Sequence, residues 1–463
     1  MLSFLDGRNR LGRRAFLRVG SLGLGGMALP GLLGAQALGA QSRLVTGKSV
    51  IFLFLHGGPS QFETFDPKMT APAGIRSATG EIATKIPGVT FGGTFPKLAQ
   101  RADQLAVIRS FVPGDANHDI KPVVGRDTSG ANLGTLYSRV VGANNPLTGM
   151  PTNAALFPQA IEAMSQPAQK GFGNFESTGT LGSGFAPFVP GAGGDLQQDM
   201  QLALPLERLG DRRALLNELD RVRVRLDTAG SLGTVDKLRE QAFSTIVGGV
   251  AGAFDLSKED PRTIERYDTS KLMTADQIDR KWNNHKFYVD NVVTLGRLLL
   301  LARRLCEAGC GFVTVTTNFV WDNHSDVNNA GVEEGMRYCG VPLDHAVSAF
   351  LDDVAERGLS DKIMLVCCGE MGRTPQINAN GGRDHWGNLG PLFLAGGRIK
   401  TGQVIGQSNR NGSEPSSEPI RIPNLVSTVM HSLFDVGELR VTRGVPNEVM
   451  RAATAADPIA GLL

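Results

Sequence analysis

Residues 49–59 read SVIFLFLHGGP, and this stretch identifies the class of fold. Residues 50–55 are all apolar and lack the alternation of polar and apolar side chains that a strand with one solvent-facing side shows. A short run of this kind is typical of a strand buried on both faces, as in a parallel sheet covered by helices. The Gly-Gly-Pro sequence that follows His56 predicts a tight loop directly after the strand.

Further elements follow from the same reading of periodicity. Four more apolar runs predict strands at 104–110, 309–317, 362–368 and 391–395. Helical periodicity predicts helices at 208–228, 235–254, 275–308, 343–357 and 422–434. Strands separated by helices predict a layered α/β fold with a mostly parallel central sheet flanked by helices. Residues 143–207 are rich in Gly, Pro, Phe and Gln without a sustained period, so we expect an irregular insertion packed on the core.

The composition is that of a folded globular protein. The chain has 463 residues, of which 41% are hydrophobic and 20% are charged. Its 47 basic residues nearly balance its 45 acidic ones, so the charge gives no reason to expect a nucleic-acid partner. The five cysteines are an odd number without framework spacing, and we interpret them as small buried apolar residues, with one bridged pair as the alternative.

The amino terminus resembles a twin-arginine export signal. Residues 12–20 read GRRAFLRVG, an apolar, glycine-rich run follows, and small residues come at 35–40. This order predicts a signal peptide at 1–40 and a single mature domain at 41–463. We expect export through the twin-arginine translocase to the periplasm or the exterior. A membrane anchor is the alternative, but glycines and Pro30 break the apolar run, so we expect no stable membrane span in the mature form.

Acidic residues and histidines gather where the predicted strands end. In open α/β sheets, ligands bind at the carboxyl ends of the strands, so loops far apart in sequence are expected to meet there. Carboxylate and imidazole groups are the usual protein ligands of divalent metals. The candidate metal ligands are Asp322, His324, Glu370, Asp384, His385, His56 and Asp66. Zinc is the favoured ion, with calcium, magnesium or manganese as alternatives.

Each candidate also has a structural interpretation. Asp322 alone could cap a turn, and His324 alone could be a surface residue. Glu370 directly follows a buried strand, where an uncompensated carboxylate is costly, so a metal or an arginine partner is favoured. Arg373 is a candidate for binding an anion through its planar guanidinium group. His118 and Thr128 lie in a polar loop and could supply a further ligand and a nucleophile.

Five segments in combination resemble the DUF1501 family, which consists largely of exported bacterial proteins. They are 56–60 (HGGPS), 65–68 (FDPK), 320–324 (VWDNH), 369–375 (GEMGRTP) and 382–386 (GRDHW). The resemblance covers nearly the whole mature chain. It implies a fold similar to that of the alkaline phosphatase and sulfatase superfamily, with a metal site at the carboxyl edge of the sheet.

The resemblance also suggests roles for residues. Asp322 and His324 match an Asp/His ligand pair, Glu370 takes the place of an aspartate ligand, and His385 matches the last histidine ligand. The chain departs from the superfamily where His56 replaces the first-strand aspartate, with Asp66 ten residues further on.

Two main functions follow from these expectations. The first is an exported metal-dependent hydrolase of phosphate or sulfate esters, small or polysaccharide, in which Thr128 is the nearest candidate nucleophile and Arg373 stabilises the developing charge. The alternative is a catalytically silent metal-binding protein of the same fold that acts in binding or assembling surface polymers. A metal-dependent mutase or transferase is a third, weaker hypothesis.

Overall fold

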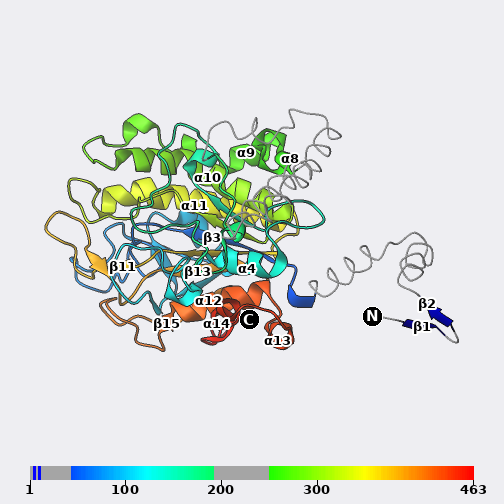
Figure 1. Ribbon diagram of the computed structural model, residues 1–463. Helices are drawn as coiled ribbons and strands as arrows, with labels where there is room; N and C mark the ends of the chain where they lie inside the picture. Colours follow the sequence, from blue (N-terminus) through cyan, green and yellow to red (C-terminus); the bar gives the residue numbers. More distant parts are fainter. Residues whose placement is uncertain (1–3, 7–8, 12–42, 192–249) are drawn as a thin grey trace.

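The computed structural model describes residues 4–6, 9–11, 43–191 and 250–463, and its centre is a seven-stranded sheet (Figure 1). The strand order is β14-β6-β13-β10-β3-β9-β8. Its members are β14 (Gln403–Ile405), β6 (Leu105–Ile108), β13 (Leu392–Gly396), β10 (Ile363–Cys368), β3 (Ser49–Phe54), β9 (Phe312–Val315) and β8 (Asn153–Leu156). Only β13 runs opposite to the other six, because it pairs antiparallel with both neighbours. The predicted layered, mostly parallel α/β fold is confirmed.

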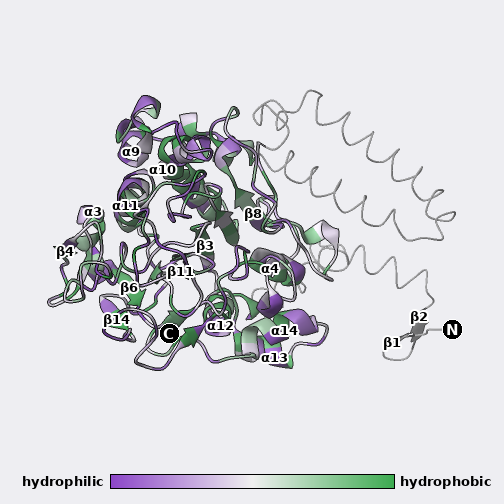
Figure 2. Ribbon diagram, turned by 90° about the vertical axis from the view of Figure 1, so that its left-hand side faces the viewer, coloured by the Kyte–Doolittle hydropathy of each residue, from purple (hydrophilic) through white to green (hydrophobic). Residues whose placement is uncertain are grey.

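The central strands are buried on both faces, which explains their uninterrupted apolar sequence. In β3, Ile51 and Leu53 pack into one hydrophobic cluster, whereas Val50 and Phe52 pack into a second one on the other face. Successive side chains of a strand point to opposite faces, so a strand that feeds two cores has no position left for a polar residue. Figure 2 shows these central strands in the colour of hydrophobic residues.

Two layers of helices cover the sheet (Figure 1). One layer contains α10 (His285–Glu307) and α11 (Val332–Glu356), which pack against each other. The other contains α4 (Leu133–Val141), α12 (Ile422–Leu433) and α14 (Asn447–Thr454). Helices thus cover both faces of the sheet. Polar side chains can therefore gather at the ends of the strands and in the loops that leave them.

The remaining elements are short. They are β1 (Phe4–Asp6), β2 (Asn9–Leu11), β4 (Glu81–Ala83), β5 (Thr90–Gly92), β7 (Phe111–Val112), β11 (Gly372–Arg373), β12 (His385–Trp386), β15 (Ile420–Arg421), α3 (Pro96–Ala99), α8 (Ala251–Phe254), α9 (Pro261–Tyr267) and α13 (Val436–Val441). All five cysteines are buried and free, so the structure has no bridged pair.

Several predicted boundaries differ from the structure. The helix α11 begins at Val332, eleven residues before the predicted start at 343, and carries Pro342 in its interior. The helix α10 begins at His285 rather than at 275. The segment predicted as an irregular insertion contributes β8, an edge strand of the central sheet. This strand has four residues, of which three are apolar, too short a run to be recognised without its neighbour β9.

Three predictions fall largely outside the described residues. The structure describes only a few residues of the predicted signal peptide at 1–40 and none of the predicted helix at 208–228. Of the predicted helix at 235–254, only the last residues are described. In the described part of the chain, none of the helices combines the length and the apolar character that crossing a bilayer requires.

Candidate metal centre

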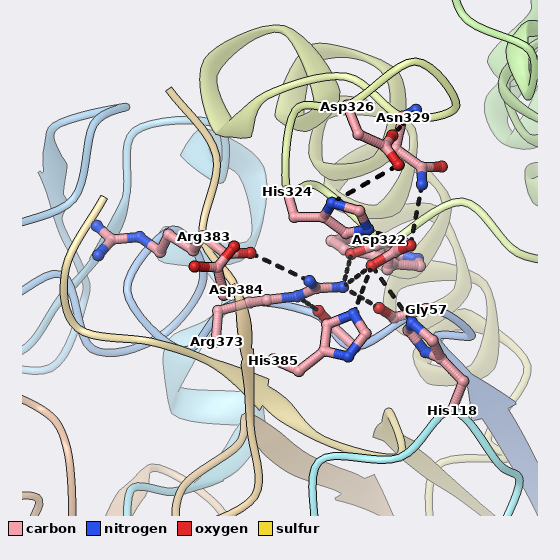
Figure 3. Close-up of polar contacts among 12 residues, drawn as sticks. Gly57, His118, Asp322, His324, Asp326, Asn329, Arg373, Arg383, Asp384 and His385 are labelled. Carbon is pink, nitrogen blue, oxygen red and sulfur yellow. Dashed lines mark hydrogen bonds and ion pairs between the residues drawn. The ribbon is translucent and has the colours of Figure 1, made fainter. Parts of the chain in front are cut away.

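The carboxylate of Asp322 lies among three imidazoles in loops at the carboxyl edge of the sheet (Figure 3). Its Oδ1 is 3.2 Å from Nε2 of His385 and 3.4 Å from Nε2 of His118, and its Oδ2 is 2.9 Å from Nε2 of His324. We call these four residues the Asp322 cluster. They come from three separate loops, which the sheet brings together as the predicted topology requires.

The approach of the loop after β9 to the loop after β3 depends on Gly57. The backbone N–H groups of Val320 and Trp321 donate to the carbonyl oxygen of His56 at 3.1 and 3.0 Å. Gly57 has a φ of +117°, and a Cβ atom there would lie 2.6 Å from the backbone nitrogen of Asp322. Only glycine fits such a close contact in this backbone conformation, so the Gly-Gly sequence after the strand fixes where Asp322 is placed.

A short hairpin places His385 next to Asp322. The strand β11 pairs antiparallel with β12, and Arg373 is directly opposite His385 in this pairing. Arg373 is fully buried, and its Nη2 donates to Oδ1 of Asp322 at 2.6 Å. The other contacts of its guanidinium group are with backbone carbonyls, those of Gly57, Gly58, Trp321 and Arg383. These contacts assign Arg373 to positioning Asp322 and the surrounding loops.

The positive groups around Asp322 stabilise the ionised form of its carboxylate. Burial alone raises the pKa of a carboxyl group, but the charge of Arg373 and the three imidazoles outweigh it and hold the pKa of Asp322 well below its usual range. Burial lowers the pKa of His118, yet the carboxylates of Asp322 and Glu370 outweigh it and raise that pKa. The interaction with Asp322 raises the pKa of His324. A cation that binds here displaces protons from the imidazoles, so its affinity is expected to increase with pH.

Glu370 and His56 are buried residues next to the cluster. Glu370 is fully buried, accepts two contacts from the N–H group of Gly57 at 2.9 and 3.2 Å, and lies 3.1 Å from Nδ1 of His118. It therefore orients the imidazole of His118, as carboxylates commonly do for metal-binding histidines. His56 is 1% exposed, and neither of its ring nitrogens has a hydrogen-bond partner among the residues that the structure describes. Burial lowers the pKa of His56 to about 4, so its ring is neutral near pH 7.

Three of the predicted site residues are not brought to the cluster. Asp384 is exposed, and Figure 3 shows its carboxylate away from the imidazoles. Asp66 forms ion pairs with Lys68 and Arg109 at 3.3 and 3.7 Å. Thr128 is buried, and its hydroxyl group exchanges hydrogen bonds with the backbone of Gly125 in a local turn. Their roles as ligands or nucleophile have no support in this geometry.

The structure places His118, which the sequence indicated only as a possible further ligand, in the Asp322 cluster. In sequence it was only a loop histidine ten residues before Thr128, and nothing in that loop indicates which strand end it faces. Its ring lies 4.2 Å from the ring of His385 between centroids. The signal that could have identified it is its position after β6 and β7, since β6 runs parallel to β10 and directs the chain toward the same edge of the sheet.

The donor atoms of the cluster fit a divalent ion. One ligand atom each from His118, Asp322 and His385 can be chosen so that all three lie within 4.8 Å of one another. Within the described residues, the buried Nε2 atom of His118 forms no hydrogen bond and has Oδ1 of Asp322 3.4 Å away, an arrangement that a cation between the two atoms would satisfy. Two imidazole nitrogens and a carboxylate oxygen suit zinc, and also manganese or iron.

The fold and this cluster define an α/β protein with a candidate metal centre at the carboxyl edge of its central sheet. The chain belongs to the family described as "Protein of unknown function (DUF1501)", which it matches over residues 47–462. No curated protein matches the sequence significantly.

Several solved structures are similar in outline. The PsFucS1 sulfatase from Pseudoalteromonas sp. is 12% identical, with 86% of this chain and 71% of that chain covered and a TM-score of 0.38. The structure of Ps i-CgsB in complex with k-i-k-neocarrahexaose is 9% identical, with 83% and 71% covered and a TM-score of 0.34. The TAB5 alkaline phosphatase mutant with Mg bound in the M3 site is 11% identical, with 80% and 96% covered and a TM-score of 0.26.

Proposed function

We propose that this protein is an exported, metal-dependent hydrolase of phosphate or sulfate esters. The observation that carries the proposal is the Asp322 cluster, in which a buried, ionised carboxylate meets three imidazoles from separate loops. A bound divalent ion would polarise an ester oxygen and activate a water molecule. The amino-terminal resemblance to a twin-arginine signal supports export to the periplasm or the exterior.

The residues of the cluster differ in burial, and their proposed roles differ accordingly. Asp322 is 3% exposed and is fixed by Arg373, so it provides a rigid anionic ligand. Asn329 donates to its Oδ2 at 2.9 Å and holds the orientation of the carboxylate. The side chains of His324 and His385 are 24% and 33% exposed, so they face the side from which a substrate can arrive. His324 is placed to bind the anionic group or to transfer a proton at its oxygen, whereas His385 is also one of the residues that could hold the ion.

Water is the proposed nucleophile. Within the described residues, no Ser, Thr or Cys side chain forms a hydrogen bond with a side chain of the Asp322 cluster. Direct attack by water in line with the departing group needs positioning and charge stabilisation rather than a covalent intermediate. The hydroxyl group of Thr128 is hydrogen-bonded to the backbone of Gly125 in a local turn and is therefore not available for this role.

A catalytically silent metal-binding protein is the second candidate. It is favoured by Arg373, whose guanidinium group is occupied by Asp322 and backbone carbonyls and is therefore not free to bind an ester anion. In this case the metal would serve structure or the binding of a surface polymer.

Metal analysis together with an ester panel tests the proposal. We expect the protein purified after native export to contain near-stoichiometric divalent metal and to hydrolyse p-nitrophenyl phosphate or p-nitrophenyl sulfate. His385→Ala is expected to lower kcat by at least about 100-fold, because it removes an exposed member of the cluster. Bound metal without turnover of either ester would favour the silent protein, and absence of both would reject the metal mechanism.

Export has a separate test. We expect replacement of Arg13 and Arg14 by lysine to leave the protein in the cytoplasm, because the twin-arginine pair is the feature that its translocase reads. Cell fractionation measures this, with Arg10→Lys as a matched control outside the pair. Unchanged export of the doubly substituted chain would remove the proposed route.

A further inference from the structure

An open groove lies beside the Asp322 cluster, between the loop that carries His118 and the segment 172–177. Its volume is about 390 Å³, which falls within the range of about 300–1,000 Å³ typical of small-molecule sites. The lining residues that matter here are Asp115, Asp119, Lys121, Phe172 and Asn174.

The groove adjoins the loop that carries His118, and its lining does not include the four residues of the Asp322 cluster themselves. Asp119 directly follows His118 in the chain, and the ring of Phe172 lies 5.2 Å from the ring of His118 between centroids. The loop that carries His385 forms part of the same region, because the carbonyl oxygen of Gly387 accepts a hydrogen bond from Gly114 at 3.0 Å. A molecule whose anionic group binds on the His118 side of the cluster can therefore place its next atoms at this groove.

The charges of the groove are balanced. Nζ of Lys121 lies 2.9 Å from Asp115 and 3.1 Å from Asp119, so its positive charge is matched by two carboxylates. Arg126 also lines the groove, so its two acidic and two basic side chains together give no net charge to attract a second anionic group on the substrate. The carboxylates accept hydrogen bonds, and the amide of Asn174 both donates and accepts, a set that suits neutral hydroxyl groups.

Phe172 gives the groove an apolar wall. Its ring is stacked on Phe319 with centroids 4.6 Å apart and an angle of 27° between the planes, so it is held in place. It remains partly exposed where it lines the groove. A rigid aromatic ring beside carboxylate and amide groups matches a sugar ring, which has an apolar C–H face and a rim of hydroxyl groups.

We propose that this groove binds a neutral sugar ring that bears the phosphate or sulfate ester presented to the Asp322 cluster. The proposal rests on the hydrolase function proposed above and names its substrate class as saccharide esters. Phe172 packs against the ring, and Asp119 and Asn174 bind its hydroxyl groups.

The test compares esters with and without a sugar. For the metal-loaded protein, kcat/KM is measured on glucose 6-phosphate and galactose 6-sulfate, and on p-nitrophenyl phosphate and p-nitrophenyl sulfate. We expect Phe172→Leu and Asn174→Ala each to lower the ratio of sugar-ester to p-nitrophenyl-ester kcat/KM by about tenfold. Lys170→Gln is the matched control, because Lys170 lies two residues before this segment, does not line the groove and, among the described residues, pairs with the half-buried Glu176. An unchanged ratio in both groove variants, with thermal unfolding as in the wild type, would overturn the proposal.

The proposal remains testable if the wild type hydrolyses none of these esters. Saturation-transfer NMR with glucose and galactose then reports binding directly. Sugar signals that Phe172→Leu abolishes and Lys170→Gln retains would support a saccharide site on a protein without hydrolase activity. Absence of transfer from either sugar to the wild type would overturn the groove assignment, while metal content reports on the cluster separately.

Discussion

Asp322→Asn is expected to weaken divalent-metal binding by at least about 100-fold, the largest effect of any single substitution in the cluster. Asp322 is the one residue that contacts all three imidazoles, through distances of 2.9 to 3.4 Å. The asparagine keeps the shape of the side chain but removes the negative charge that holds a cation. Metal content after dialysis, followed by titration with zinc, measures the change.

Asp384→Asn is the matched control for this substitution. Asp384 was also predicted as a ligand, but it is exposed and accepts a hydrogen bond from Asn378 at 3.1 Å instead of contacting the cluster. Its removal is expected to leave metal binding unchanged. Equal loss of metal in both variants, or full retention in Asp322→Asn with unchanged thermal unfolding, would reject Asp322 as the central ligand.

Arg373→Met is expected to lower the free energy of unfolding of the metal-free protein by about 3–5 kcal/mol, because it leaves a buried charge without its partner. Asp322 loses the nearest positive charge, and the carbonyl oxygens that Arg373 binds lose their donor. Urea unfolding followed by circular dichroism measures the loss. A bound divalent ion supplies positive charge beside Asp322, so we expect the loss to be smaller when zinc is present.

Arg398→Met is the control for this prediction. Arg398 has a side chain that is 71% exposed and pairs with the equally exposed Asp361, and its loss is expected to change stability by no more than about 0.5 kcal/mol. An Arg373→Met protein as stable as the wild type would show that the guanidinium group does not support the cluster. A loss that zinc does not reduce would separate the role of Arg373 from the metal site.

The local sequence was sufficient to predict much of the fold. The runs at 49–55 and 362–368 correspond to β3 and β10, since strands buried on both faces admit only apolar residues whatever surrounds them. Element ends were less predictable. The helix predicted from residue 343 begins at Val332 and continues through Pro342, because its packing against α10 outweighs the local preference of proline.

The sequence by itself also determined that Asp322, His324, Glu370 and His385 follow strand ends, where topology alone brings side chains to one edge of the sheet. Only the tertiary structure decided which of the neighbouring acids and imidazoles face one another. The structure places His118 in the cluster, whereas Asp66 and Asp384 interact with other residues. The guanidinium group of Arg373 binds backbone carbonyl oxygens. The physical reason is that loop direction depends on contacts between distant segments, such as the approach of Gly57 to Asp322, which no local pattern encodes.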